Sequence, residues 1–223
     1  MNSAFNNLPE EKRNRIIQIC IEEFAEHGYM NASTNTITSR AEISKGILFH
    51  YFKNKKSLYL YMLEYSIDIL AEKVFSVFHS LQNRQMDFFE SIKISVLKKM
   101  ELATLYPNEN KLIMMATYQL PVSIKEDVLQ LIMKKREVLE PMSTEYIYHS
   151  LREDMLVDGL SREKAIEMIN ALFEFLGVKY GKIYKGEPEE LIKNQHLLME
   201  DLNIYTKVLK YGLYSPSKNS EKE

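Results

Sequence analysis

Residues 33–58 constrain the fold more than any other part of the chain, and they read STNTITSRAEISKGILFHYFKNKKSL. Two short segments with helical spacing of apolar residues are separated by Glu42-Ile43-Ser44, and lysines cluster where a third segment begins. Two short helices joined by a tight turn are the outline of a helix-turn-helix. The segment therefore predicts a helical unit whose second short helix can enter the DNA major groove.

Another helix is expected before this segment. Pro9 suits the first turn of a helix that ends at His27, and Gly28 can stop it. Cys20 lies within the apolar stripe of this helix, so we interpret its thiol as core packing rather than as a reactive group. The residues of the stripe are Ile16, Ile17, Cys20, Ile21 and Phe24.

Caps and inward-facing residues fit the two short helices. Ser33 or Thr34 can cap the first helix, and Ser44 can cap the second. The residues expected to face inward are Ile37, Ala41, Leu48 and Phe52.

The rest of the chain also predicts helices. Asn54 can cap a long helix that reaches about residue 81, and others are expected at 87–105, 109–119, 123–156, 162–185 and 188–213, with a break or kink at Pro141. Because the chain has only 7 Gly and 6 Pro and few strand-like runs, an all-α protein of about nine helices is expected. Residues 1–56 would form a three-helix helix-turn-helix domain, residues 57–214 a larger helical domain, and residues 215–223 a disordered polar tail.

The net charge of −2 is unevenly distributed along the chain. Residues 1–56 hold eight Lys/Arg and six Asp/Glu, a net charge of +2, whereas the remainder holds 21 and 25, a net charge of −4. Within residues 40–56, Glu42 is the one acidic residue. The basic residues there are Arg40, Lys45, Lys53, Lys55 and Lys56. A compact basic patch on an otherwise acidic chain is typical of a phosphate-binding surface, and a solvated charged face is the alternative.

Two features within the patch conflict with helix stability. Lys55 and Lys56 fall in the first turn of a helix, at the positive end of its dipole, and a bound phosphate would remove that conflict. Gly46 falls early in a short helix, where glycine costs about 1 kcal/mol relative to alanine. Close approach of the backbone to another surface would explain this glycine.

Side chains of the second short helix can also contact DNA. His50 and Tyr51 can donate hydrogen bonds to phosphates or bases, and Ile47 can touch a thymine methyl group.

The segment resembles the N-terminal signature of the TetR family of bacterial transcriptional regulators, over about residues 10–65. The residues that carry the resemblance are Gly28, Tyr29, Ala32, Ser33, Thr34, Ile37, Ala41, and the run from Ser44 to Lys55. Over the remaining chain the resemblance is only architectural. It implies a homodimeric repressor in which the two short helices form the reading unit on double-stranded DNA with a palindromic operator.

The resemblance also implies which residues contact DNA. They are Thr34, Asn35, Ser44, Lys45, Gly46, Ile47, Phe49, His50, Tyr51 and Lys55. Three residues depart from the family pattern. Glu42 replaces the usual glycine of the turn, Thr38 replaces an alanine, and Phe49 replaces a tyrosine, which removes a hydroxyl that could bond a phosphate.

Apolar residues in the last two expected helices repeat at intervals of three and four, which is typical of packing seams between helices. We interpret these seams as a dimeric four-helix bundle, and packing within the chain is the alternative. The residues expected at the dimer interface are Ile169, Phe173, Leu176, Tyr180, Leu198, Leu202 and Tyr205.

The middle of the chain is rich in methionine and aromatic residues, which suit a ligand cavity because methionine adapts to irregular shapes. A mostly apolar small molecule is the expected effector, and plain core packing is the alternative. The candidate ligand-binding residues are Phe88, Met114, Met115, Tyr118, Met142 and Tyr146.

The expected function is thus a sequence-specific regulator that a ligand releases from DNA. The alternative is a DNA-binding architectural or recruitment protein without a ligand. No enzyme, cofactor or metal is expected, because the scattered histidines match no catalytic or metal motif. Glu145, His149 and Glu153 share a spacing of four, which could hold a metal, but we favour a salt-bridging helix face.

No apolar run reaches the length of about 18 residues that a membrane span needs. The N-terminus also lacks the features of a signal peptide, and the one cysteine cannot form an internal disulfide. A cytoplasmic protein without a membrane partner is therefore expected.

Overall fold

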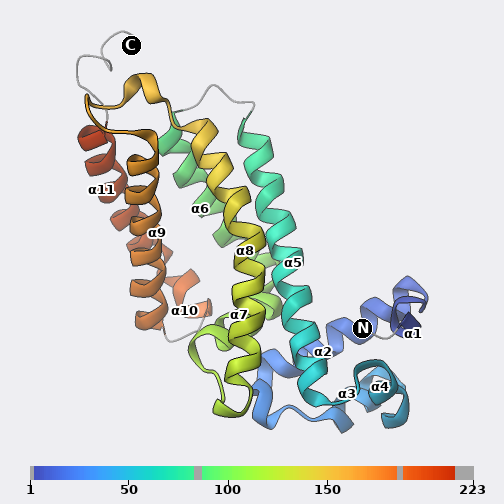
Figure 1. Cartoon of the computed structure of the whole chain (residues 1–223). Helices are drawn as coiled ribbons and strands as arrows, with labels where there is room; N and C mark the ends of the chain where they lie inside the picture. Colours follow the sequence, from blue (N-terminus) through green and yellow to red (C-terminus); the bar gives the residue numbers. More distant parts are fainter. Residues whose placement is uncertain (1–2, 83–86, 185–187, 214–223) are drawn as a thin grey trace. The chain divides into compact units, whose positions relative to one another are not determined.

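The computed structural model describes residues 3–82, 87–184 and 188–213, and within them it is helical with no strand, which confirms the all-α prediction (Figure 1). The elements are α1 (Ser3–Asn6), α2 (Glu10–Asn31), α3 (Thr34–Ala41), α4 (Lys45–Phe52), α5 (Lys55–Gln82), α6 (Phe88–Leu105), α7 (Pro107–Tyr118), η1 (Val122–Ile124), α8 (Lys125–Ser150), η2 (Glu153–Met155), α9 (Arg162–Tyr184), α10 (Pro188–Lys193) and α11 (Gln195–Leu213).

Two of the expected helices differ in detail, and one short helix was not expected. The helix expected over 188–213 is interrupted at Asn194, so α10 and α11 are separate helices. The Asn194 side-chain amide donates to the Glu190 carbonyl at 2.8 Å. Helix α8 runs through Pro141 without a break, and it ends at Ser150 rather than 156. The short α1 was not expected, because its four residues are too few to show a helical pattern.

The chain packs into two compact units. Unit 1 contains residues 3–70, 106–135 and 188, and unit 2 contains residues 71–82, 87–105, 136–184 and 189–213. The chain passes from unit 1 to unit 2 within α5, returns to unit 1 between α6 and α7, and passes to unit 2 again within α8. Unit 1 extends beyond residue 56 because α7 packs against α2. The domain division at residues 56 and 214 stays a prediction, and residues 215–223 lie outside the described residues.

The core of unit 1 joins the expected apolar stripe of α2 to the short helices. Every residue of the stripe is buried, and Cys20 is fully buried. The residues of α3 and α4 that were expected to face inward are buried with it, and so are Leu58 and Met62 of α5. Burial of these apolar side chains is what fixes the two short helices, since helices this short are not stable alone.

Two buried ionisable groups of this core predict that unit 1 loses stability in alkaline solution. Burial raises the pKa of the Cys20 thiol to about 12, and burial raises the pKa of the Tyr59 hydroxyl to about 12. The folded chain therefore holds these two protons more tightly than the unfolded chain does. This contribution is fully present below the ordinary pKa values of 9.0 and 10.0, and it is lost as the pH rises towards 12.

The measurement is the free energy of unfolding in urea at several values between pH 8 and pH 12. We expect it to fall with pH in the parent chain, by at most about 4 kcal/mol for Cys20 and about 3 kcal/mol for Tyr59. The double variant Cys20→Ala/Tyr59→Phe should show a shallower fall. An identical slope in both proteins would contradict the assignment.

Gly28 interrupts the helical backbone of α2, as its sequence position suggested. Its φ of 67° and ψ of 173° lie in a region that is essentially restricted to glycine. A Cβ atom at this position would also lie 3.1 Å from the Cε atom of Met115 in α7. The glycine therefore permits both the turn out of α2 and the close packing of α7.

Gly28→Ala is expected to lower the free energy of unfolding by roughly 1–3 kcal/mol, because alanine is strained in this backbone conformation. Urea unfolding followed by circular dichroism would measure it. Gly212→Ala is the matched control, because Gly212 lies in helical backbone and an added Cβ would meet no atom within 4 Å. Equal effects of the two substitutions would show that the conformation of Gly28 is not the cause.

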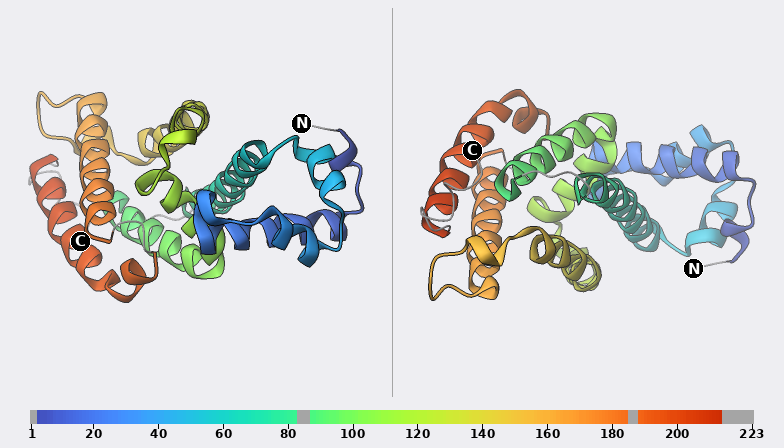
Figure 2. Two further views of the ribbon diagram at one scale, coloured as in Figure 1. Left: turned by 90° about the horizontal axis from the view of Figure 1, so that it is seen from below. Right: turned by 90° about the horizontal axis from the view of Figure 1, so that it is seen from above.

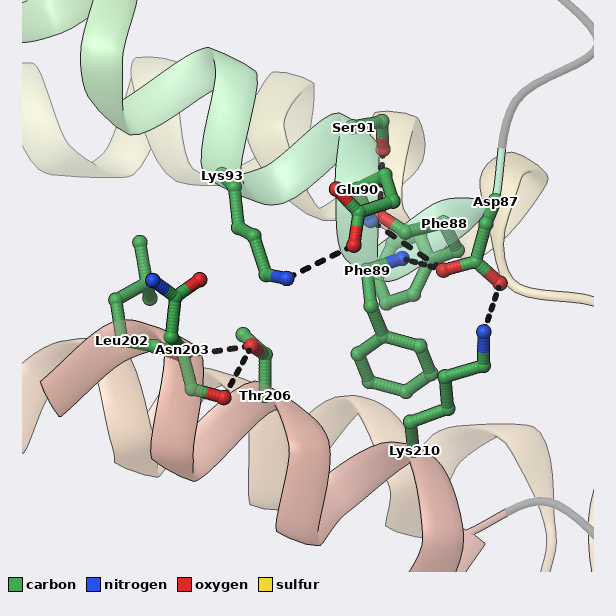
Figure 3. Close-up of polar contacts among 10 residues, drawn as sticks. All are labelled: Asp87, Phe88, Phe89, Glu90, Ser91, Lys93, Leu202, Asn203, Thr206 and Lys210. Atoms are coloured by element: carbon green, nitrogen blue, oxygen red, sulfur yellow. Dashed lines mark hydrogen bonds and ion pairs between the residues drawn. The ribbon is translucent and has the colours of Figure 1, made fainter. Parts of the chain in front are cut away.

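In unit 2, α11 packs against both α6 and α9, and both views of Figure 2 show the red α11 beside these helices. Asp87 caps α6, since its carboxylate accepts from the N–H groups of Phe89 and Glu90 at 3.0 and 3.3 Å. Its other oxygen pairs with Lys210 of α11 at 3.3 Å, and Figure 3 shows Phe89 directed from α6 toward α11 beside this pair. Cap, ion pair and aromatic packing together hold α6 on α11.

Candidate nucleic-acid interface

Helix α3 is fixed to α2 through its first turn. The sequence left Ser33 and Thr34 as alternative caps, and Ser33 is the N-cap: its hydroxyl accepts from the Thr36 N–H at 3.2 Å. The Ser33 N–H donates in turn to the Glu23 carboxylate of α2 at 2.7 Å. Glu23 is buried, so this hydrogen bond is shielded from water and positions the start of α3.

The turn between α3 and α4 is as tight as a glycine would make it. Glu42 adopts left-handed backbone angles, with φ 54° and ψ 42°. The Glu42 N–H donates to the Ser39 carbonyl at 3.3 Å, and the Ile43 N–H donates to the Thr38 carbonyl at 3.1 Å. These two bonds define a Schellman motif, in which glycine is the usual residue. The Glu42 carboxylate also pairs with Arg15 of α2 at 2.7 Å.

Helix α4 separates its buried and exposed faces cleanly. Ser44 caps it by accepting from the Ile47 N–H at 3.2 Å. Leu48 and Phe52 point into the core of unit 1, as expected, while Lys45 and Ile47 are exposed. The helix is thus anchored along one face and accessible along the other.

The predicted DNA-contacting residues all lie in unit 1, on α3, α4 and the start of α5. The exposed ones are Asn35, Ser44, Lys45, Gly46, Ile47 and His50. The half-buried ones are Thr34, Phe49, Tyr51 and Lys55. Their contacts with DNA remain a prediction.

The lysines at the start of α5 have partners within the protein that the sequence did not reveal. Lys55 donates to the Met30 carbonyl at 3.0 Å, and its ammonium lies 5.2 Å from the centroid of the Tyr29 ring. Burial lowers the pKa of Lys55. Lys56 pairs with both carboxylate oxygens of Asp127 at 3.0 Å. These contacts offset the repulsion between the lysines and the helix dipole without any bound anion.

Two arginines of the region are also paired. Arg40 bonds to Glu22 of α2 at 2.5 Å, and Arg15 donates to the Arg40 carbonyl at 3.2 Å as well as to Glu42. No periodic pattern relates these positions in the sequence, so only the packing of α3 on α2 brings them together.

The comparisons with known proteins match two parts of the chain. Residues 16–62 match the model for bacterial regulatory proteins of the tetR family, and this span runs from α2 into α5. Residues 86–214, more than half of the chain, match the model for tetracyclin repressor-like C-terminal domains. The chain belongs to the TetR family. This confirms the resemblance that the N-terminal residues indicated.

Relatives with known names within the TetR family are transcriptional regulators. The chain is 35% identical over 74 residues to the transcriptional activator FasR of Mycolicibacterium smegmatis. This alignment covers 33% of this chain and 34% of FasR. It is 31% identical over 74 residues to the repressor AcnR of Corynebacterium glutamicum, or 33% of this chain and 39% of AcnR. These alignments span about a third of the relatives' own length. A helix-turn-helix regulator of Staphylococcus aureus is 25% identical over 158 residues, or 68% of this chain and 79% of that protein.

Solved structures of TetR-family regulators share the fold. A regulator from Chloroflexus aurantiacus superposes with a TM-score of 0.58 at 25% identity, and the match covers 96% of this chain and 98% of that one. The regulator FadR from Bacillus subtilis, solved in complex with stearoyl-CoA, gives a TM-score of 0.55 at 17% identity, with 90% and 99% covered. At that identity the second likeness shows the fold alone.

The predicted ligand-binding residues of this TetR-family chain fall in both units, and each is described within its own unit. Phe88 is buried beside Phe89 in unit 2, with ring centroids 5.2 Å apart. In α7 of unit 1, Met115 packs over Gly28, and Tyr118 is 41% exposed. The sulfur of Met114 lies 3.8 Å from the side-chain amide of Asn110. The side chains of Met142 and Tyr146 lie outside the described part of α8. The ligand site stays a prediction.

The residues predicted at the dimer interface are instead largely interior to unit 2. Ile169, Leu176, Tyr180 and Leu202 are each at most 5% exposed in the single chain. The remaining three, Phe173, Leu198 and Tyr205, are half-buried and pack against the same core. Packing within the chain, the alternative to a dimer seam, therefore accounts for the four buried positions, and a dimer contact at the three half-buried ones stays a prediction.

Tyr180 shows how closely α9 and α11 are joined. Its hydroxyl lies 2.8 Å from the Leu197 carbonyl and 2.8 Å from the Asp201 carboxylate. Lys179 forms an ion pair with the same carboxylate. Burial, together with the hydrogen bond to Asp201, raises the pKa of Tyr180. The network links the two helices within one chain.

Within the described residues, neither a metal-binding cluster nor a membrane-spanning helix is present. Among residues 3–82, 87–184 and 188–213, no group of three acidic, histidine or cysteine side chains could hold a metal ion. The side chain of His149 lies outside this part, and Glu153 lies in η2 rather than on α8 with Glu145. None of the described helices combines the length and apolar character that crossing a membrane requires.

Proposed function

We propose that the chain is a homodimeric transcriptional regulator that binds a palindromic DNA operator through α4. We further propose that it leaves the operator when a mostly apolar small molecule binds its C-terminal region. The observation that carries the proposal is the exposed face of α4, on a helix whose opposite face is buried and whose start is capped. A rigid helix with one accessible face is what reading of the major groove requires.

The charges around α4 support DNA as the partner. Among the described residues, the side-chain ammonium groups of Lys45 and Lys53 have no hydrogen-bond or ion-pair partner, so they can meet phosphates or bases without first losing a contact. Lys55 uses one of its three N–H donors on the Met30 carbonyl, and two remain for a phosphate. Lys45 begins α4, Lys53 follows α4 directly, and Lys55 begins α5.

Exposed apolar side chains on α9 and α11 support a dimer. On each helix they follow one stripe at helical spacing, next to the stripe that is buried within unit 2. The stripe of α9 contains Met168, Phe175 and Val178, which are between 46% and 51% exposed, and the stripe of α11 contains Leu197, Ile204, Val208 and Tyr211, which are between 43% and 65% exposed. Apolar surface of this kind typically marks an interface. We assign the dimer contact to these two stripes.

Selection of bound sequences from random duplex DNA, at two salt concentrations, tests the DNA-binding part of the proposal. We expect a palindromic consensus and tight binding that weakens as salt rises. Weak binding without enrichment, present only at low salt, would contradict sequence-specific recognition.

Lysine substitutions test which side chains contact the DNA. Lys45→Ala is expected to weaken binding and change the preferred sequence, whereas Lys55→Ala should weaken binding to all duplexes alike. Each should reduce the salt dependence by about one phosphate contact. Lys12→Ala is the control, because Lys12 is exposed on α2 and outside the reading unit. Parental binding by both variants would refute the assignment.

The selected duplex then serves as the probe for effectors. We expect an apolar compound to lower operator affinity, because a ligand acts only through a difference in affinity between two states. Operator binding that no compound in a broad panel changes would instead support a DNA-binding architectural or recruitment protein.

A further inference from the structure

Unit 1 contains an open groove of about 550 Å³. The proposed binding of DNA through α4 gives no role to this groove. It lies between the end of α4, the first turns of α5 and Leu131 of α8, all of which belong to unit 1. Its volume falls within the range of about 300–1,000 Å³ that small-molecule sites occupy.

The wall of the groove is an aromatic cluster that is already assembled. Phe52 and Tyr61 line the groove, and their ring centroids are 5.3 Å apart. Phe5 of α1 is fully buried behind them, 4.7 Å from Phe52 and 5.8 Å from Tyr61. Tyr51 packs on the same ring at 5.4 Å. Because these aromatic rings are already packed against one another, ligand binding does not have to order their side chains.

One end of the groove offers hydrogen-bond donors and positive charge. Lys53 and Ser57 line it, and among the described residues neither the Lys53 ammonium nor the Ser57 hydroxyl has a hydrogen-bond partner. The Lys53 N–H bonds to the Phe49 carbonyl at 2.8 Å, which fixes the backbone from which its side chain extends. Ser57 lies in the first turn of α5, at the positive end of the helix dipole. This end suits an anionic group.

The other end presents no unpaired negative charge. Glu64 lines the groove, but its carboxylate is paired with Lys135 at 2.9 Å. Lys135 also pairs with Asp68 at 2.8 Å. Ser57 and Glu64 are seven residues apart on α5, which corresponds to about 10 Å along the helix axis. Between them the lining is apolar, with Leu60 of α5 and Leu131 of α8.

We propose that this groove binds a small aromatic carboxylate. The acid group lies at Lys53 and Ser57, and the ring system lies between Tyr61, Leu60 and Leu131. Length, apolar lining and the Lys53 ammonium together match a molecule of one or two fused rings with one acid group. The site is separate from the predicted ligand residues of the C-terminal region.

Competition between this ligand and DNA is also expected, and this expectation rests on the proposed function. His50 and Tyr51 line the groove and are also predicted DNA contacts. A carboxylate bound there occupies Lys53 and covers the end of α4, so it should compete with DNA.

Methyl NMR on the full chain with labelled leucines tests the site without DNA, using 1-naphthoate as the probe. We expect saturable shifts of the Leu60 and Leu131 methyl signals, and little change at Leu202, which is buried in unit 2. The affinity should fall at least fivefold in Lys53→Gln and for the uncharged 1-naphthalenemethanol. Lys12→Gln should bind as the parent does. Shifts confined to other leucines, or equal binding of the uncharged analogue, would overturn the proposal.

A second measurement separates the groove from the proposed function. With the selected duplex, 1-naphthoate should raise the apparent Kd for DNA in the parent chain and have a smaller effect in Lys53→Gln. If the chain binds no duplex specifically, the proposed function fails while the NMR result still decides the groove. If 1-naphthoate binds in the groove and the Kd for DNA does not change, competition is overturned and the binding site stands.

Discussion

Leu48→Ala is expected to lower the free energy of unfolding by about 2–5 kcal/mol. Leu48 is fully buried, and it is the central contact between α4 and the core of unit 1. Alanine would leave a cavity beneath the helix that carries the proposed reading face, so DNA binding should fall together with stability. Urea unfolding followed by circular dichroism measures the first effect, and titration of the selected duplex measures the second.

The matched control is the preceding residue, which is exposed. Ile47 is 42% exposed, so Ile47→Ala should change the free energy of unfolding by no more than about 0.5 kcal/mol. It should still weaken binding to the selected duplex by about tenfold, the size of a single lost base contact. The pair therefore separates folding from recognition within one helix. If Ile47→Ala bound the duplex as tightly as the parent, α4 would not be the reading helix.

Phe175→Asp is expected to convert the dimer to monomers. Phe175 lies on the exposed apolar stripe of α9 and is 51% exposed in the single chain. A buried, unpaired carboxylate at a dimer contact is strongly unfavourable. Affinity for a palindromic operator should then fall by at least about 100-fold, because each monomer holds only one half-site. Light scattering coupled to size-exclusion chromatography would give the mass, and duplex titration would give the affinity.

Asn170→Asp is the control for the added charge. It lies on the same helix as Phe175 but off the exposed stripe. We expect this variant to remain a dimer and to bind the duplex as the parent does. A Phe175→Asp protein that stays dimeric at the same concentration would show that the two stripes are not the contact.

Local sequence determined the helix-turn-helix. Ser33, Ser44 and Asn54 cap the helices that follow them, and the Asn54 side chain accepts from the Ser57 N–H at 2.8 Å. Capping and helical periodicity act over three or four residues, so they can be recognised from sequence alone. For the same reason the apolar stripe of α2 identified its buried face, and the all-α class followed from few glycines, prolines and strand-like runs.

Contacts between distant residues were decided only by the tertiary structure. Lys56 and Asp127 are 71 positions apart, and no pattern in the chain relates them. The sequence could also not choose between the faces of α9 and α11, because both helices are apolar around most of their circumference. The packing of α11 against α6 and α9 buries one stripe and leaves its neighbour exposed. The groove beside α4 likewise exists only because Leu131 of α8 is brought beside α5, since a cavity depends on what helices far apart in the chain leave unfilled.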